Sequence, residues 1–233
     1  MLNKIKNNPL PYLLALVFVV AEVALWGYIQ LGTQISCWVR YSSVALAFVF
    51  VLYSFKKDYL WLFTACAMVM TLCADVFLVI LNPIKQITAM VFFNFAQVFY
   101  ALRLFTRQTG KKQRLVHLFV RVGLCAIAVV ATLLVLGQTA NTLAVISMIY
   151  YANLLVNIVY AFVVRDTIFA VGLIFFALCD AFVGFGVLCD MLNAPVDSLL
   201  HKIAYPSFDA VWLFYVPSQT LIALSTLKHK LTA

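Results

Sequence analysis

Residues 168–188 read IFAVGLIFFALCDAFVGFGVL, an uninterrupted apolar stretch whose single charged residue is Asp180. Residues 59–81, YLWLFTACAMVMTLCADVFLVIL, show the same arrangement with Asp75 as the single charge. About 20 consecutive apolar residues are enough for a helix to cross the hydrocarbon core of a bilayer. A carboxyl group at that depth is costly unless it is paired, protonated or hydrated. Each stretch is therefore predicted to be a transmembrane helix that carries a functional-site candidate.

The composition of the whole chain agrees with a membrane protein. The 233 residues are 66% hydrophobic and only 10% charged, whereas soluble domains carry about 25% charged residues. Each backbone N–H inside a bilayer must be satisfied within its own span, so helix is the expected state. We predict a single integral membrane domain over residues 1–233, an all-α polytopic bundle of about eight helices. The predicted spans are 10–31, 38–54, 59–81, 87–104, 115–136, 143–164, 168–188 and 210–227.

The basic residues are distributed unevenly over the segments that connect these spans. With the N-terminus inside, the outside segments hold only Arg40, Lys85 and Lys202. The inside segments hold Lys4, Lys6, Lys56, Lys57, Arg103, Arg107, Lys111, Lys112, Arg114, Arg165, Lys228 and Lys230. This asymmetry predicts that both termini are cytoplasmic, and we expect a bacterial inner-membrane protein. The net charge of +8 is explained by topology and by anionic lipid heads, so no nucleic-acid partner is expected.

The two halves of the chain share short sequence similarities. Residues 72–77, LCADVF, resemble residues 178–182, LCDAF, and each stretch lies in the third span of its half. Such similarity favours a possible parallel 4+4 repeat, in which Asp75 and Asp180 lie on helices that run in the same direction. The longest outer segment, 189–209, could cover an outward-facing site or serve as a plain connector.

Polar side chains form stripes along the predicted helices, because residues three or four positions apart share a helix face. The stripes are Glu22, Trp26 and Gln30; Thr71 and Asp75; Asn94, Gln97 and Tyr100; Tyr150, Asn153, Asn157 and Tyr160; Asp180 and Gly184; and Trp212, Tyr215 and Gln219. Many of these residues fall near mid-membrane, as one polar cavity would require. The alternative is that the amides and tyrosines join helices through hydrogen bonds. We expect Arg121 near the inner end of its span, with no lysine or arginine deep in any span.

The chemistry that these residues could support is carboxylate chemistry. No lysine inside a span is available for a retinal Schiff base, and no HExxH spacing for zinc is present. Two acids in an apolar cavity can differ in proton affinity, so that one acts as a general acid and the other as a base. The same pair could instead carry protons for a transporter. The residues by themselves leave both possibilities open.

Four short motifs resemble the YhhN family of membrane proteins, which includes lysoplasmalogenases. The family pattern GD-x-x-L is matched by residues 74–78, ADVFL, and F-x-x-x-H-x-x-Y by residues 93–100, FNFAQVFY. The pattern F-x-x-S-D is matched by residues 176–180, FALCD, and Y-x-x-A-Q-x-L-I by residues 215–222, YVPSQTLI. Their order and the eight-helix layout match over nearly the whole chain. The departures are Ala74, Cys179 and, in place of the family's histidine, Gln97.

The resemblance implies hydrolysis of the vinyl-ether bond of a lysoplasmalogen to a fatty aldehyde and a glycerophospho-base, without a cofactor or metal. The expected partners are this lysophospholipid and membrane lipid. Asp75 and Asp180 are then the catalytic acid/base pair, with their individual roles unassigned. The expected substrate-binding residues are Gln97, Asn94, Tyr100, Asn153, Tyr215, Gln219 and Glu22. Arg40 or Lys202 is a candidate for holding the phosphate.

Two alternative functions are compatible with the same residues. A proton-coupled carrier or flippase for a small amphiphile would move its substrate without covalent change, and its transport would depend on a pH gradient. A non-catalytic lipid-binding protein would tolerate replacement of both aspartates by asparagine. Gln97 has no titratable group where the family has a histidine, and this departure is compatible with the non-catalytic alternative.

Overall fold

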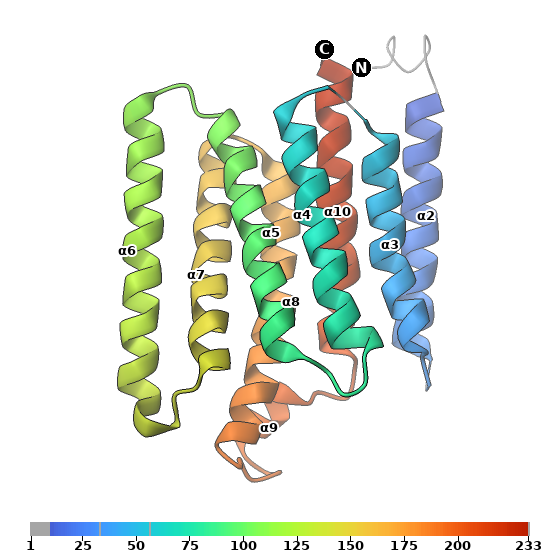
Figure 1. The fold of residues 1–233 in the computed structure, drawn as a ribbon. Coiled ribbons are helices and arrows are strands. Elements are labelled where there is room, and N and C mark those ends of the chain that lie inside the picture. The colour runs from blue at the N-terminus through green and yellow to red at the C-terminus, as the bar shows by residue number, and fades with distance from the viewer. Residues whose placement is uncertain (1–9, 33, 56, 233) are drawn as a thin grey trace.

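The structure is a computed structural model that describes residues 10–32, 34–55 and 57–232, with side chains described as far as residue 227. Within these residues the regular structure is entirely helical, in an up-and-down bundle (Figure 1). The helices are α2 (Leu10–Leu31), α3 (Cys37–Tyr53), α4 (Tyr59–Asp75), α5 (Gln86–Thr106), α6 (Lys111–Leu136), α7 (Thr142–Val163), α8 (Thr167–Met191), α9 (Leu199–Ala204) and α10 (Ala210–Thr232). A π-helical turn, η1 (Val76–Ile80), continues α4, and a short 3₁₀ turn, η2 (Gly137–Thr139), follows α6.

The predicted set of about eight spans is confirmed. Over the described part of the chain, seven helices are long and apolar enough to cross a membrane, and α3 is the shorter apolar helix beside them. Its 17 residues correspond to about 26 Å at 1.5 Å per residue, at the lower limit for a span. The largest differences from the predicted ends are that α6 begins at Lys111, α8 continues to Met191 and α10 continues to Thr232. The outer segment 189–209 contains the short helix α9.

The central helices are α4, α5, α8 and α10, and α2 and α6 lie at opposite edges (Figure 1). Helix α4 packs along α5, and α8 packs along α10. The α4 and α8 helices run in the same direction, as predicted for the two helices that carry Asp75 and Asp180. Their continuations differ, since α4 passes into the π-helical turn directly after Asp75 whereas α8 stays α-helical beyond Asp180. The parallel 4+4 repeat stays a prediction.

The edge helix α6 shows how the usual pattern of burial is reversed in this fold. Its buried residues are the polar side chains His117, Arg121 and Thr132. Large apolar residues face outward, with Leu134 79% exposed and Val135 82% exposed. Such an apolar exterior would be unstable in water, whereas lipid solvates it at no cost. The polar interior and apolar exterior are those of a membrane bundle.

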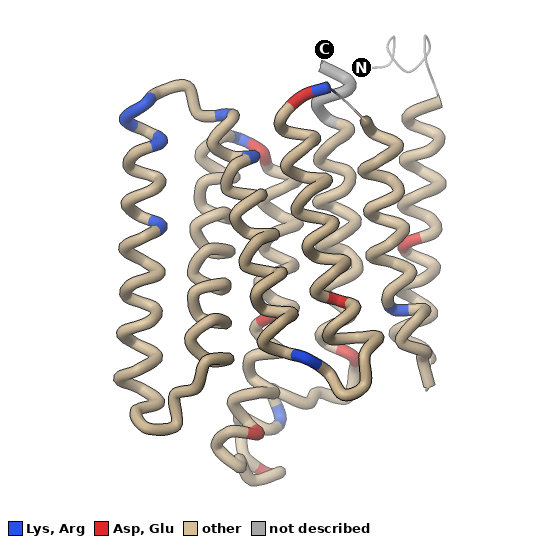
Figure 2. The backbone as a smooth tube through the Cα atoms, in the orientation of Figure 1, with Lys and Arg blue, Asp and Glu red and all other residues tan. Residues whose placement is uncertain are grey.

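Most of the described charged residues lie toward the two ends of the bundle, and a few lie part-way along the helices (Figure 2). The end where α5 finishes and α6 begins carries most of the described Lys and Arg residues, and the opposite end carries Arg40, Lys85 and Lys202. This segregation agrees with the predicted uneven distribution of charge. Lys4, Lys6 and Lys56, and the side chains of Lys228 and Lys230, lie outside the described residues. Which end faces the cytoplasm stays a prediction.

The starts of α4 and α7 carry local side-chain caps. Asp58 Oδ1 accepts a hydrogen bond from the backbone N–H of Trp61 (2.6 Å) at the start of α4. Asn141 Oδ1 accepts from the N–H of Ala144 (2.8 Å) at the start of α7. The first backbone N–H groups of a helix have no partner within the helix, so these caps supply one. They mark where α4 and α7 begin, and these two helices carry polar residues described below.

The contact between α8 and α10 depends on Gly172. A Cβ atom at this position would lie 3.1 Å from the backbone nitrogen of Ile222 and 3.2 Å from the Leu221 Cβ. We therefore expect Gly172→Ala to lower the free energy of unfolding by about 1–3 kcal/mol, the usual cost of overpacking. Gly184→Ala on the same helix is the matched control, because a Cβ there meets nothing within 4 Å. Thermal unfolding of the purified protein in micelles measures the difference, and equal melting temperatures for the two variants would refute it.

Candidate functional site

Asp75 is the last residue of α4 and is buried in the bundle, with 2% of its surface exposed. The hydroxyl of Tyr215 on α10 donates a hydrogen bond to Asp75 Oδ2 (2.7 Å). A buried carboxyl requires such a partner, because an unpaired polar group in an apolar interior is costly. The contact joins α4 to α10, two helices that are far apart in the sequence.

Asp180 lies on α8 and is half-buried. The Tyr150 hydroxyl, on α7, donates a hydrogen bond to Asp180 Oδ2. Each aspartate therefore has one tyrosine hydroxyl on one carboxyl oxygen. The arrangement leaves the second oxygen of each carboxyl group for other contacts.

An aromatic cluster connects the two aspartate–tyrosine pairs. The ring of Phe176 lies 6.4 Å from that of Tyr150 and 5.6 Å from that of Tyr215, measured between centroids. We name the group formed by Asp75, Asp180, Tyr150, Tyr215 and Phe176 the carboxylate site. Asp75 and Tyr215 thus meet directly, whereas the pairing of Asp75 with Asp180 as acid and base stays a prediction.

No cation pairs with either carboxyl group among the described side chains. The ion pairs found there join Arg40 to Asp209, and both Arg103 and Arg107 to Asp166. Burial with a tyrosine partner and without a cation is unusual for a purely structural carboxylate. Such a group is a candidate for proton transfer.

A second polar level lies one helical turn from the carboxylate site. Tyr100 on α5 contacts Met68 on α4, with 3.7 Å between the hydroxyl and the sulfur. Because α4 and α5 are antiparallel, the next turn places Gln97 level with Thr71, one turn before Asp75. Gln219 follows Tyr215 by one turn on α10 and belongs to the same level.

Three side chains at this level are fully buried and have polar atoms without a protein partner. They are Gln97 Nε2, Ser218 Oγ and both amide atoms of Gln219. Buried polar atoms are nearly always hydrogen-bonded, so each exception calls for an explanation such as water or a ligand. We name Gln97, Ser218 and Gln219 the polar layer. Their unpartnered atoms make the polar layer a candidate for binding a polar molecule.

Arg121 contradicts the expectation that no cation lies deep in a span. It sits ten residues from the start of α6, about 15 Å along the helix, and is 9% exposed. Its guanidinium donates to Asn153 Oδ1 (2.7 Å) and to Asn157 Oδ1 (2.6 Å). The expectation failed because α6 begins four residues earlier than the apolar run. The sequence did contain a signal for this position. Arg121 is the only charged residue within residues 115–136, and the stripe of amides on α7 could bind it.

The remaining predicted site residues occupy other positions. Asn153 Oδ1 accepts a hydrogen bond from Arg121 (2.7 Å). Glu22 on α2 is buried and accepts a hydrogen bond from Ser43 Oγ (2.6 Å) on α3. Asn94 donates to the backbone oxygens of Met90 (2.9 Å) and Ile146 (3.3 Å), between α5 and α7. The structure joins none of these three to the aspartates through a described hydrogen bond, and their role in substrate binding stays a prediction.

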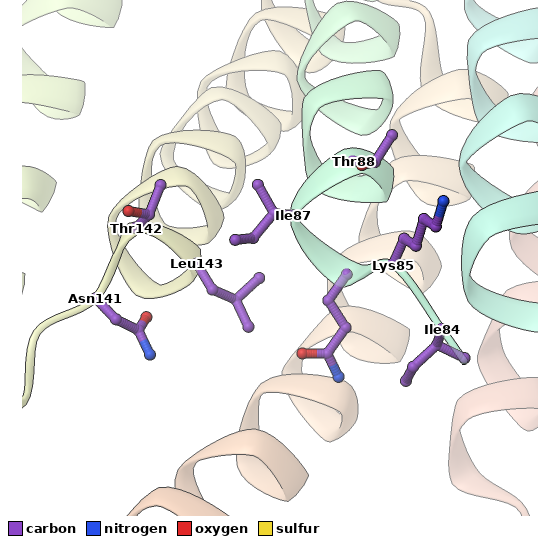
Figure 3. A pocket seen from close by; sticks show the side chains of 8 residues that line it. Ile84, Lys85, Ile87, Thr88, Asn141, Thr142 and Leu143 are labelled. Atoms are coloured by element: carbon purple, nitrogen blue, oxygen red, sulfur yellow. The ribbon is translucent and has the colours of Figure 1, made fainter. Parts of the chain in front are cut away.

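Two openings follow the surface between α5 and α7. One, of about 720 Å³, lies where both helices begin and is lined by Ile84, Lys85, Gln86, Ile87, Thr88, Asn141, Thr142 and Leu143 (Figure 3). The other, of about 250 Å³, lies further along the same helices and is lined by Val91, Asn94, Phe95, Val98, Ile146 and Ile149. Neither is lined by an aspartate. The first has a mixed polar and apolar lining and the second is mainly apolar, and we name the two openings together the α5–α7 groove.

Removal of one tyrosine hydroxyl tests the carboxylate site. Tyr215→Phe leaves Asp75 Oδ2 without its described donor, and a hydrogen bond to a charged group contributes about 1.5–3 kcal/mol. For the lysoplasmalogen hydrolysis that the family resemblance implies, we expect turnover to fall about 10- to 100-fold, with little change in secondary structure. Tyr205→Phe is the control, since Tyr205 donates to the exposed Asp190 (2.9 Å). Steady-state kinetics of both variants decide the point, and equal turnover would remove Tyr215 from the site.

Fold and site together define a polytopic α-helical membrane protein with two tyrosine-bonded aspartates, one buried and one half-buried. The sequence pattern of the YhhN family matches residues 35–226, most of the chain, and the protein belongs to that family. The matched region contains the carboxylate site and the polar layer but leaves out Glu22. No curated protein and no solved structure gives a match to this chain.

Proposed function

We propose that this protein hydrolyses the vinyl-ether bond of a lysoplasmalogen, releasing a fatty aldehyde and a glycerophospho-base. The observation that carries the proposal is the carboxylate site, in which two aspartates from separate helices share one aromatic surrounding without a cation partner among the described residues. Membership of the YhhN family supports the substrate class.

The chemistry needs one protonated and one ionised carboxyl group. A protonated carboxyl delivers its proton to the β-carbon of the vinyl ether, which leaves an oxocarbenium ion at the carbon bonded to oxygen. The ionised carboxyl accepts a proton from water as the water oxygen adds to that carbon. The hemiacetal then collapses to the aldehyde, and its proton passes to the departing glycerol oxygen. General acid and base groups of this kind typically contribute about 10²–10⁴ in rate.

The tyrosine hydroxyls hold the two carboxyl groups in position for these steps. Each donates to a single oxygen, so the other oxygen of Asp75 and of Asp180 can face the substrate. Phe176 keeps the space between them apolar. A low-polarity surrounding strengthens the electrostatic stabilisation of an oxocarbenium ion by a nearby carboxylate.

The α5–α7 groove supports a single-chain phospholipid as the substrate. Its second opening is apolar, which suits an alkenyl chain, whereas the first opening carries Lys85 and several amide and hydroxyl groups. Arg40 is the weaker candidate for the phosphate, because it pairs with Asp209 (2.7 Å) and lies 5.8 Å from the Trp212 ring. We therefore favour Lys85 as the phosphate-binding residue.

Isotope labelling tests the reaction. Purified protein is incubated with a lysoplasmalogen in H₂¹⁸O or D₂O, and a saturated alkyl lysophospholipid serves as the control substrate. We expect aldehyde from the vinyl ether only, an unlabelled glycerol oxygen, and one deuterium on the carbon next to the aldehyde. Absence of aldehyde would reject the proposal. Movement of the lipid in vesicles, dependent on a pH gradient, would favour a carrier instead.

A further inference from the structure

A buried guanidinium without a carboxylate partner controls the hydrogen bonds around Gln97. Within the described residues Arg121 forms no ion pair, and its two terminal nitrogens bond Asn153, Asn157 and His117 Nε2. A guanidinium has donors only. The atoms that it contacts must therefore be acceptors.

Because the Arg121 guanidinium can only donate, it determines the orientation of the Asn157 amide and, through it, of the Gln97 amide. Asn157 offers its Oδ1 to Arg121 (2.6 Å), so its Nδ2 must point the other way. That nitrogen donates to Gln97 Oε1 (2.9 Å) and to the Gln97 backbone oxygen (3.0 Å). Gln97 thus uses its carbonyl oxygen toward Asn157 and has only its amide nitrogen left. The usual ambiguity of amide orientation is removed, because the chain starts from a group that cannot accept.

The remaining Gln97 Nε2 is a buried donor without a partner. The side chain is completely buried and this nitrogen makes no hydrogen bond. It belongs to the polar layer, where Gln219 also has unpartnered amide atoms. A buried donor without a hydrogen-bond partner is energetically costly, so proteins seldom retain one unless a ligand or water accepts its hydrogen bond.

We infer that Arg121, acting through Asn157, holds the Gln97 amide as a hydrogen-bond donor for an acceptor oxygen of a ligand bound at the polar layer. Arg121 and Asn157 are positioning residues, and Gln97 is the residue that binds. The identity of the acceptor, a substrate oxygen or the attacking water, rests on the proposed function. The direction in which the Gln97 amide donates is independent of that function. Position 97 then needs a donor rather than a titrating group.

A pair of substitutions at Gln97 separates donation from size and packing. Gln97→Met removes the donor, while Asn157 keeps the Gln97 backbone oxygen as an acceptor. Gln97→His retains a donor, because one ring nitrogen must accept from Asn157 and the other then carries the hydrogen. We expect kcat/KM to fall about tenfold in Gln97→Met and to stay within about threefold in Gln97→His.

Thermal unfolding of the ligand-free variants distinguishes binding from a structural role. Gln97→Met removes a buried unpartnered donor, so its melting temperature should equal or exceed that of the wild type. A purely structural Gln97 predicts the reverse, with stability and activity lost together. Such a joint loss, or equal activity of Gln97→Met and the wild type, would overturn the inference.

A double-mutant cycle tests the path through Arg121. Arg121→Met frees the Asn157 amide to turn, so kcat/KM should fall, and Arg121→Lys should retain more activity because lysine is also donor-only. The double variant Arg121→Met/Gln97→Met should be little worse than either single variant. Fully additive losses would reject the path through Asn157.

A ligand readout that needs no turnover separates this inference from the proposed reaction. The probe is a saturated alkyl lysophospholipid, which carries acceptor oxygens but no vinyl ether. We expect it to raise the melting temperature of the wild type and of Gln97→His, and to raise that of Gln97→Met less. If the wild type releases no aldehyde but shows this pattern, the reaction fails and the donor assignment stands. An equal shift in all three proteins would reject the assignment.

Discussion

Replacement of Asp75 or Asp180 by asparagine is expected to lower aldehyde release from a lysoplasmalogen by at least about a hundredfold, because either change removes a group that gives or takes a proton. Asparagine keeps the shape of the side chain and can still accept the hydrogen bond from Tyr215 or Tyr150. The change therefore acts on proton transfer and leaves the surrounding contacts in place.

Asp190→Asn is the matched control for this prediction. Asp190 lies on the same helix as Asp180 and also accepts a tyrosine hydroxyl, from Tyr205 at 2.9 Å, but it is exposed. We expect its activity to equal that of the wild type. Kinetics of the three variants should be combined with melting temperatures, so that unfolding is separated from loss of chemistry. Full activity of Asp75→Asn or Asp180→Asn would remove that residue from catalysis.

The largest effect on stability is expected at the buried ion pair between Arg103 and Asp166. Both side chains are 0% exposed, and Arg103 Nη2 lies 2.7 Å from Asp166 Oδ2. Arg103 Nη1 also donates to Thr64 Oγ1 (2.9 Å) on α4. Asp166 stands directly before α8, so the pair ties the last turn of α5 to α4 and to the start of α8.

Asp166→Leu should lower the free energy of unfolding by about 3–5 kcal/mol, because it leaves the Arg103 charge buried without its partner. The double variant Arg103→Met/Asp166→Leu should recover much of that loss, since two apolar side chains remove both desolvated charges. Chemical or thermal unfolding in micelles gives the measurement.

The matched control for the ion pair is Asp209→Leu, which breaks the pair with Arg40 at the opposite end of the bundle. That pair has the same 2.7 Å separation, but its side chains are 34% and 28% exposed. Exposed pairs contribute only about 0–1 kcal/mol, so a small loss is expected. A similar loss in Asp166→Leu and Asp209→Leu, or no recovery in the double variant, would show that burial of the Arg103 charge is not the cause.

Several site assignments could be made from the sequence because they depend on depth alone. Asp75 and Asp180 were identifiable as single charges within long apolar stretches, and Tyr215 as part of a polar stripe at a similar depth. The partner of each group was not identifiable in this way. Tyr150 shared its stripe with three other polar residues, and only the packing of α7 against α8 brings it to Asp180.

Arg121 and Glu22 also show that the depth of a residue along a helix does not identify its partner. Arg121 was expected at the edge of the membrane but lies within the bundle, bonded to the amides on α7. Glu22 was expected beside the aspartates but pairs with Ser43 between α2 and α3. In both cases the depth along a helix was a poor guide to which neighbour the side chain faces.

The sequence by itself determined the number of spans, their approximate ends and the presence of two carboxyl groups in the interior, because bilayer thickness converts a run of apolar residues directly into a helix of known length. Tertiary structure alone decided which hydroxyl meets which carboxylate and which way the Gln97 amide points. The physical reason is that lipid and protein interior are equally apolar, so hydropathy does not show which face of a membrane helix turns inward. Helix rotation and register, set by packing, provide that information.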